Sequence, residues 1–413
     1  MKSAGLGELP RGASRDGGPP RPVFAVWELT LRCDQRCGHC GSRAGPPRPN
    51  ELSTDEVLDV ARALARLGCR ECTLIGGEAY LRADLPLVVA ELARLGVRVG
   101  LQTGGRAFDT ERALALRDAG LDTVGVSVDG PEAVHDVLRG WRGSYSAAMR
   151  AIEASVAAGL VTTSNLQVNR LNVDHLRAVF DALRDRRVAA WQVQLTVAMG
   201  NAADRPEWIL EPAQVIDVID ALAGLQAEAA ARPRPWESDR FYIWAGNNLG
   251  YFGPHEATLR SVPGLGVSHY SGCKAGIHVV GIEADGTVKG CPSLPTGPYA
   301  GGNVREASLD DLWANADALR FARERTTEEL WGFCRTCAYA DVCRGGCSFT
   351  AHATLGKRGN NPFCYHRAAT LRHQGLRERL VLRDKAPGLP FDFGRFDLVE
   401  EPREPPSGGS AAG

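Results

Sequence analysis

Three cysteines within eight residues, Cys33, Cys37 and Cys40, constrain this chain more than any other feature of its sequence. They form a C-x3-C-x2-C triplet that directly follows an apolar, strand-like run, Phe24 to Leu31. Thiolates this close together can bind one inorganic centre, and cysteine is the usual ligand of a [4Fe–4S] cluster. Such a cluster has four irons, so three cysteines leave one iron free to bind a cofactor or a substrate.

Zinc and disulfides are the alternatives for this triplet. Structural zinc takes four ligands, commonly with a distant second pair, and nothing near the triplet supplies that pair. A disulfide framework is typical of small secreted domains, and a chain of 413 residues is not one. The iron–sulfur interpretation is therefore favoured.

Composition argues against several classes of function. The formal net charge is −1, so electrostatics give no case for a nucleic-acid or acidic-membrane partner. No apolar run approaches the roughly 18 residues of a membrane span, and residues 1–22 have no signal-peptide core. We therefore expect the twelve cysteines to be reduced, largely metal-bound and cytoplasmic.

Strand-like and helix-like runs alternate from Phe24 to about residue 200. This pattern predicts an α/β fold with a parallel sheet and right-handed crossovers. Six strands predict an open or partial (β/α) barrel, with its chemistry at the carboxyl ends of the strands. Ser53 and Glu56 predict a capping box at the first helix. The expected strands are 24–30, 72–75, 98–102, 123–128, 163–168 and 191–197; the expected helices are 54–67, 85–95, 110–119, 146–158, 173–184 and 212–231.

Changes in composition divide the chain into five expected segments. The cysteine-rich segment is the smaller of the two domains, and the ends are rich in Gly and Pro, as disordered segments often are. The segments are a disordered leader at 1–22, the barrel at 23–200, a bridging region at 201–272, the cysteine-rich domain at 273–370, and a C-terminal helix with a disordered tail at 371–413.

Two short motifs follow strands of the expected barrel. Gly76-Gly77-Glu78 comes after the second strand, where glycines permit close backbone approach and a carboxylate can pair with an amine. Ser127-Val128-Asp129-Gly130 ends the fourth strand, where a plain Asp-Gly turn is the alternative.

Other polar residues and two further cysteines are harder to interpret. Cys69 and Cys72 form a C-x2-C pair without a partner pair, and we expect both to be small core residues. Polar residues of the fifth and sixth strands are expected to contact the barrel lumen, although the sequence does not rank them: Gln167, Asn169, Asn172, Gln194 and Thr196. Gln102 lies at the end of the third strand, and His135, Asp136 and Arg139 follow the Asp-Gly turn, where the start of a surface helix is the alternative.

The cysteine triplet and the two motifs resemble the radical S-adenosylmethionine (SAM) superfamily, and the resemblance implies that the α/β core is a partial (β/α)6 barrel similar to a TIM barrel. The resemblance implies that Cys33, Cys37 and Cys40 hold a cluster whose open iron binds the amino and carboxylate groups of SAM. The reduced cluster of that family cleaves SAM to methionine and a 5′-deoxyadenosyl radical. The cofactors carry this chemistry, while the protein supplies binding, aim and exclusion of water.

The same resemblance implies roles in SAM binding for individual residues. Glu78 is expected to bind the SAM amino group, although Ala79 stands where the family usually has proline. Ser127 and Asp129 are expected near the ribose and the carboxylate, and His39 beside the adenine. The expected cofactor-binding residues are thus His39, Gly76, Gly77, Glu78, Ser127 and Asp129.

Seven more cysteines lie close together in the last third of the chain. Paired disulfides would leave one of them over, so we expect them to bind metal, with zinc as the alternative. They are Cys273, Cys291, Cys334, Cys337, Cys343, Cys347 and Cys364. An Asp-Gly hairpin turn at Gly286 is expected to set Cys291 in place.

This spacing resembles the SPASM domain of peptide-modifying radical SAM enzymes, which carries two auxiliary [4Fe–4S] clusters. The resemblance implies three clusters in total. Seven cysteines serve eight iron sites, so the inner cluster has an open iron or takes another ligand such as His269. The implied ligands are Cys334, Cys337, Cys343 and Cys364 for the outer cluster, and Cys273, Cys291 and Cys347 for the inner one.

The function implied is that of an oxidoreductase-type maturase of a ribosomally made precursor peptide (RiPP), acting by cross-linking, oxidation, decarboxylation or epimerisation. Maturases of mycofactocin and pyrroloquinoline-quinone precursor peptides are the nearest in kind. A radical SAM enzyme for small molecules and a non-catalytic iron–sulfur electron-transfer protein stay open as alternatives. The expected partners are the precursor peptide, an electron donor such as flavodoxin or ferredoxin, and a separate leader-peptide recognition protein unless the protein's own surface serves. No catalytic acid or base is assigned.

Overall fold

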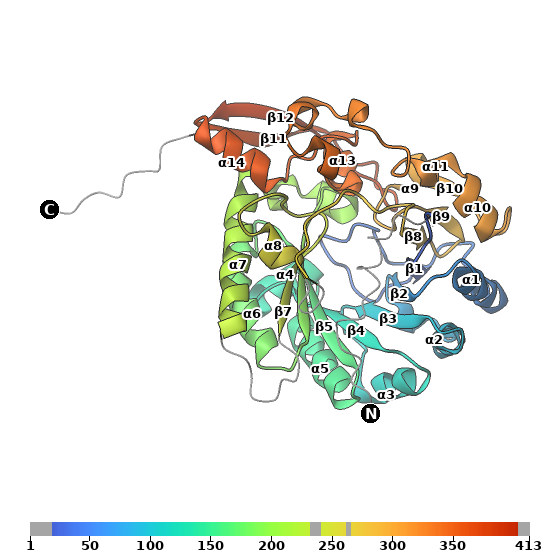
Figure 1. Cartoon of the computed structure of the whole chain (residues 1–413). Helices are drawn as coiled ribbons and strands as arrows, with labels where there is room; N and C mark the ends of the chain where they lie inside the picture. The colour runs from blue at the N-terminus through green and yellow to red at the C-terminus, as the bar shows by residue number, and fades with distance from the viewer. Residues whose placement is uncertain (1–18, 232–240, 262–265, 404–413) are drawn as a thin grey trace.

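A ten-stranded sheet organises the molecule, in the order β10-β9-β8-β1-β2-β3-β4-β5-β6-β7. The computed structural model describes residues 19–231, 241–261 and 266–403 (Figure 1). Strands β1 to β7 pair in chain order and in parallel, so their carboxyl ends meet along one edge. Their bounds are β1 Phe24–Thr30, β2 Glu71–Gly76, β3 Arg98–Thr103, β4 Thr123–Ser127, β5 Val161–Val168, β6 Ala190–Leu195 and β7 Tyr242–Ala245.

Helices cover the outer face of this sheet because alternate strand residues on that side are apolar and buried. In β4, for example, Val124 and Val126 are fully buried in the main core, whereas Ser127 on the other face is half-buried. The predicted capping box is present, because Ser53 and Glu56 each accept from the other's backbone N–H. The outer helices are α1 Thr54–Arg66, α2 Leu85–Arg94, α3 Thr110–Asp118, α5 Ser144–Ala157, α6 Leu176–Arg184 and α7 Val215–Ala231.

The C-terminal domain continues the barrel sheet at the free edge of β1. Strand β8, Val279–Ile282, pairs in parallel with β1, and β9, Thr287–Lys289, turns back against β8. The predicted Asp-Gly turn joins them, with Gly286 at a φ of 89° that favours glycine. The remaining elements are α8 Glu256–Arg260, α9 Thr296–Tyr299, β10 Ala300–Asn303, α10 Leu309–Asn315, α11 Asp317–Arg320, α12 Ala340–Cys343, α13 Ser348–Leu355 and α14 Tyr365–His373.

The structure corrects two expectations within the described residues. The bridging region contributes a seventh barrel strand, β7, because the edge of β6 is free to pair with it. The helix and disordered tail expected over 371–413 are wrong up to residue 403. There α14 ends at His373 and is followed by an antiparallel hairpin of β11, Leu376–Asp384, and β12, Arg395–Pro402. Residues 404–413 lie outside the described part.

Two further points concern the N-terminus and membranes. The leader expected at 1–22 lies outside the described residues up to residue 18. In the part that is described, the carbonyl oxygen of Pro20 accepts a hydrogen bond of 3.1 Å from Trp313 Nε1. No helix in the described residues is both long enough and apolar enough to cross a membrane.

Candidate functional site

The three cysteines of the triplet lie in the loop that follows β1, and each sulfur accepts a hydrogen bond from the protein. The backbone N–H of Gln35 lies 3.4 Å from Cys33 Sγ, and that of Ala44 lies 3.4 Å from Cys40 Sγ. Arg139 Nη1 lies 3.8 Å from Cys37 Sγ. All three thiols are free of disulfides. Donors aimed at sulfur are what cluster thiolates need, because they stabilise the negative charge.

Two buried polar atoms of this loop show that it fits a group bound beside it. Asp34 Oδ1 and Gln35 Nε2 have no hydrogen-bond partner in the described residues. Burial also raises the pKa of the Cys37 thiol to about 12, so without a metal this thiol keeps its proton. Binding a cluster would displace that proton, as metal binding to thiols generally does.

The Gly76-Gly77-Glu78 segment holds the start of the cysteine loop. The N–H groups of Gly77 and Glu78 donate to the carbonyl oxygens of Thr30 and Arg32, each at 2.8 Å. A Cβ on Gly76 would come within 2.2 Å of Thr30 O, and one on Gly77 within 2.1 Å of Arg32 O. Both glycines are therefore required by the approach of the loop's own backbone, which the sequence did not reveal.

Glu78 is a buried carboxylate that keeps capacity for a further partner. It accepts 2.7 Å hydrogen bonds from Thr103 Oγ1 and from the backbone N–H of Gly104. Burial raises its pKa to about 7 despite these bonds. A cationic amine bound here would favour the ionised form and gain charge-assisted hydrogen bonds.

Asp129 is also buried, but both of its carboxylate oxygens already have protein partners. Oδ2 lies 2.6 Å from Arg139 Nη2 and 3.3 Å from His39 Nε2, and Oδ1 accepts from the N–H of Gln167 at 3.0 Å. Burial would raise the pKa of Asp129, but Arg139 and His39 outweigh it and hold that pKa well below its usual range. Asp129 thus positions Arg139, which in turn reaches Cys37.

His39 and Ser127 complete the set expected around SAM. The His39 ring is held by Asp129 and by the carbonyl oxygen of Leu138, 3.1 Å from Nδ1, at the end of α4, Glu132–Arg139. Ser127 ends β4 on the lumen side, and its hydroxyl makes no hydrogen bond within the described residues. Their roles at the adenine and the ribose remain predictions.

The other polar residues near strand ends now separate into two kinds. Asn169, Asn172 and Thr196 are fully buried, and their side chains hydrogen-bond to backbone or to each other. His135 is fully buried too, with Nδ1 accepting from the N–H of Asp129 at 3.0 Å. The half-buried Gln102, Gln167 and Gln194 face the lumen.

Three cysteines of the C-terminal domain lie close enough to affect one another. Burial, and then the neighbouring thiols of Cys273 and Cys291, raise the pKa of Cys347 to about 12. Burial and Cys273 raise the pKa of Cys291 to about 11. This group therefore brings together cysteines that are far apart in the chain: Cys291 follows Cys273 by 18 positions (291 − 273), and Cys347 follows Cys291 by 56 (347 − 291).

The other four cysteines form a second group. Burial, and then the thiols of Cys343, Cys334 and Cys337, raise the pKa of Cys364 well above its usual range. His269, the alternative ligand for the first group, has Nδ1 3.0 Å from the carbonyl oxygen of Tyr270. The two groups have the same members as the sets implied by the resemblance, four cysteines and three, and their roles as cluster ligands remain predictions.

In the described part of the chain, no three His, Cys, Asp or Glu side chains form a group that could hold a single metal ion. Cys69 and Cys72 stay in the core, as expected, with Cys69 Sγ 3.2 Å from the carbonyl oxygen of Glu71.

Two structural features of the site have no clear signal in the sequence. Tyr251 is buried between the two cysteine groups: its hydroxyl accepts from the N–H of Cys347 at 3.2 Å, and its carbonyl oxygen lies 3.7 Å from Cys364 Sγ. The other feature is the loop between β11 and β12, where Asp392 Oδ1 lies 2.8 Å from Arg43 Nε. Arg43 also pairs with Asp204 at 2.6 Å.

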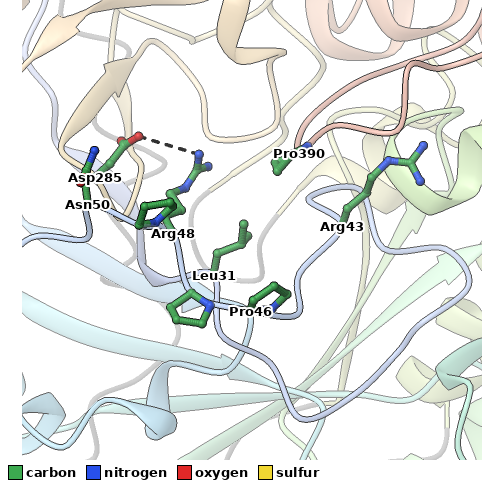
Figure 2. A pocket seen from close by; sticks show the side chains of 9 residues that line it. Leu31, Arg43, Pro46, Arg48, Asn50, Asp285 and Pro390 are labelled. Atoms are coloured by element: carbon green, nitrogen blue, oxygen red, sulfur yellow. Dashed lines mark ion pairs between the residues drawn. The ribbon is translucent and has the colours of Figure 1, made fainter.

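A pocket of about 270 Å³ lies where the cysteine loop, the β8–β9 turn and the β11–β12 loop meet (Figure 2). Its charged residues already have partners: besides the Arg43 contacts, Arg48 lies 2.9 Å from Glu28 and 3.8 Å from Asp285. The pocket therefore offers no unpaired arginine. Its lining residues are Leu31, Arg43, Pro46, Pro47, Arg48, Pro49, Asn50, Asp285 and Pro390.

Comparisons with known proteins agree with this geometry. A family model described as the radical SAM superfamily matches residues 27–183. The chain is 33% identical over 349 residues to the mycofactocin maturase MftC of Mycobacterium ulcerans, covering 83% of this chain and 88% of that protein. The chain belongs to the radical SAM superfamily.

Further matches to this radical SAM enzyme extend over both domains. A model described as an iron–sulfur cluster-binding domain, SPASM, matches residues 273–338. The AdoMet-dependent heme synthase of Oleidesulfovibrio alaskensis is 28% identical over 365 residues, covering 87% of this chain and 91% of that protein. Streptococcus suis SuiB bound to its precursor peptide SuiA has a similar fold, with a TM-score of 0.63, 15% identity, and coverage of 80% and 72% of the two chains. The expected fold class, a partial barrel followed by a SPASM domain, is confirmed, as is the dependence on SAM and iron–sulfur clusters.

Proposed function

We propose that this radical SAM enzyme is a maturase that modifies a residue of a ribosomally made precursor peptide. The observation that carries the choice of a peptide is the 33% identity to a mycofactocin maturase. Identity to the heme synthase is lower, at 28%. The partners expected from the sequence, an electron donor and a leader-peptide recognition protein, belong to this proposal, as does a cytoplasmic location.

The residues of the barrel fit binding of SAM and its cluster. When bound, the two supply a 5′-deoxyadenosyl radical. Cys33, Cys37 and Cys40 would hold the cluster, and Glu78 would pair with the SAM ammonium. Arg139, held by Asp129, donates to the sulfur of Cys37. The burial of Glu78 and Asp129 keeps water away from these charges.

The SPASM domain is proposed to hold two auxiliary clusters, three in the chain altogether. The division of its seven cysteines into a group of four and a group of three supports this count. The group of three leaves one iron open, or a further ligand completes it. The domain division expected from the sequence is kept as part of the proposal, with β7 assigned to the barrel and the β11–β12 hairpin in place of a tail.

The test uses anaerobically reconstituted full-length protein with SAM, dithionite and the peptide encoded by a short open reading frame beside its gene. We expect SAM cleavage together with a change in peptide mass. No SAM cleavage would instead indicate an electron-transfer protein. SAM cleavage with an unchanged peptide would overturn the choice of substrate.

A tetrapyrrole is the second candidate substrate, because the heme synthase match also extends over most of both proteins, 87% of this chain and 91% of the heme synthase. The same incubation with coproporphyrin III, a tetracarboxylate porphyrin, tests it. Conversion of the porphyrin without conversion of the peptide would favour this candidate.

A further inference from the structure

The inner face of the barrel sheet carries uncharged polar side chains, and these indicate what kind of substrate the lumen can bind. Residues paired across neighbouring strands lie on the same face. Ser127 pairs with Asn165, Asn165 with Gln192, and Gln167 with Gln194. The alternate residues of these strands, such as Leu166 and Val193, are fully buried in the core beneath the helices. These polar residues therefore face the lumen.

Uncharged polar side chains cover the inner face toward the carboxyl ends of β3 to β6. Five of the six are carboxamides, all half-buried. Gly125 makes room for them, because a Cβ there would lie 2.2 Å from Gln102 Oε1. The six residues are Gln102, Ser127, Asn165, Gln167, Gln192 and Gln194.

Charged side chains on the inner face of strands β1 to β7 are already paired. Glu28 on β1 lies 2.9 Å from Arg48. Glu71 and Arg98, at the opposite end of their strands, lie 3.2 Å apart. A ligand bound against these strands therefore meets no free charge from them.

Three of the carboxamides are free to bind a ligand. Gln102 and Asn165 hydrogen-bond to each other. The described residues offer no hydrogen-bond partner to the side-chain amides of Gln167, Gln192 and Gln194. Trp244 on β7 pairs with Gln192 and adds an aromatic surface beside it.

A carboxamide has one acceptor oxygen and an NH₂ donor, which complement the C=O and N–H of a peptide group. A ligand with several carboxylates would instead call for arginine or lysine, since burying an unpaired charge is costly. We infer that the lumen binds an uncharged stretch of peptide backbone, with Gln192 and Gln194, supported by Gln167, hydrogen-bonding its amide groups. This inference rests on the proposed function and names the chemistry of its substrate segment.

The test follows transfer of deuterium to 5′-deoxyadenosine. The probes are N-acetylated decapeptide amides made from perdeuterated Gly, Ala, Val and Ser, and deuterated coproporphyrin III. Abstraction breaks a C–D bond of the bound probe and forms one at the 5′ carbon, with the electron for SAM cleavage supplied by dithionite. We expect deuterium from the peptides and at least tenfold less from the porphyrin.

Variants of Gln192 and Gln194 test whether deuterium transfer from the peptides depends on these two side chains. At subsaturating peptide, the double variant Gln192→Leu, Gln194→Leu should lose at least tenfold in deuterium transfer, with SAM cleavage in the absence of peptide kept within twofold. Gln192→Asn with Gln194→Asn should recover part of the transfer, and the exposed Gln374→Leu should behave as wild type. Iron content checks that each variant folds.

The outcomes separate this inference from the proposed function. Transfer from the peptides that is unchanged in the leucine variant overturns the inference and leaves the peptide substrate in place. Transfer from the porphyrin alone overturns both. No transfer from either probe overturns the inference, while the mass change of the encoded peptide still decides the proposed function.

Discussion

Two buried carboxylates beside the cysteine loop, those of Asp129 and Glu78, have different pKa values because their hydrogen-bond partners differ. Asp129 faces the guanidinium of Arg139, which keeps the carboxylate ionised. Glu78 faces only neutral donors, so burial raises its pKa to about 7. A buried carboxylate without a cationic partner is costly, and a bound amine would supply that partner.

Replacing Glu78 with glutamine should weaken SAM binding without changing iron content. A hydrogen bond to a charged group is worth roughly 1.5–3 kcal/mol, so we expect the Kd for SAM to rise about tenfold or more. The affinity of the wild type should fall as pH drops below about 7, because Glu78 then takes a proton. The variant should lack this dependence. Equilibrium dialysis from pH 6 to 8.5 measures both, and an unchanged Kd would contradict the assigned role.

The same carboxyl should affect stability in the absence of SAM. Its pKa is 4.5 ordinarily and about 7 in the folded state, so the folded state keeps a proton that the unfolded state loses. Stability therefore falls as pH rises from about 4.5 to about 7. Glu78→Gln removes this loss, so its Tm relative to wild type should increase over that window. Thermal denaturation of SAM-free protein tests the sign, and a difference in Tm that shrinks with pH would refute it.

Arg139 should raise the reduction potential of a cluster bound to Cys37, because a positive charge near the sulfur favours the reduced state. A charge about 4 Å away is worth about 4 kcal/mol at an effective dielectric constant of 20, but Asp129 neutralises much of it. We therefore expect Arg139→Gln to lower the potential by tens of millivolts in an EPR titration. Arg142→Gln, an exposed neighbour, is the control, and equal potentials in the two variants would exclude this role.

At the scale of elements, the sequence predicted those structural features that depend only on neighbouring residues. The capping box of α1 and the Asp-Gly turn between β8 and β9 depend on residues within a few positions. Strand β7 has only four residues and is a strand because the edge of β6 pairs with it. The β11–β12 hairpin depends on distant partners too, such as Glu211, whose Oε2 accepts a 2.9 Å hydrogen bond from the N–H of Leu380, 169 positions further along the chain. Contacts of that range cannot be seen in a single sequence.

The loop of the β11–β12 hairpin should stabilise the cysteine loop through Asp392. Asp392 is buried against Arg43, and Arg43 keeps Asp204 as its other carboxylate partner when Asp392 is removed. We therefore expect Asp392→Ala to lower the free energy of unfolding by about 1–3 kcal/mol, the usual cost of leaving a buried hydrogen-bonding group without its partner. It should also speed the loss of about four irons, one cluster's worth, to a chelator. Denaturant titration and timed iron analysis measure the two effects.

Asp397→Ala on the same hairpin is the matched control. Asp397 lies 3.6 Å from Arg383 with both side chains 59% exposed, and such surface pairs contribute about 0–1 kcal/mol. If both alanine variants lose iron at the wild-type rate, the hairpin has no part in holding the cluster.

At the scale of the whole molecule, the cysteine spacing predicted which residues matter, and the folded chain shows how they are combined. Cys347 lies between Cys343 and Cys364 in the sequence, yet its thiol neighbours are Cys273 and Cys291. The link from Cys37 through Arg139 to Asp129 also joins segments about 100 residues apart. Spacing alone revealed neither Arg139 as a donor to sulfur nor Tyr251 between the two groups.

Iron analysis of wild-type protein and of a triple cysteine variant tests the number of clusters and the site of SAM cleavage. Three clusters predict on the order of twelve irons per chain, four for each cluster. Alanine at all three of Cys33, Cys37 and Cys40 should remove about four irons and all SAM cleavage. Continued formation of 5′-deoxyadenosine by that variant would refute the assignment.

The decisive comparison is between Cys347→Ala and Cys343→Ala, four positions apart in the chain (347 − 343). Because their thiol neighbours differ, each change should disturb a different auxiliary cluster, giving two distinct losses in Mössbauer and EPR spectra. Cys69→Ala, a core cysteine away from both groups, should keep all the iron. Identical spectra for the two variants would show that Cys347 and Cys343 serve one cluster. Stoichiometric zinc in the wild-type protein would show that the cysteines of this domain bind zinc and not iron–sulfur clusters.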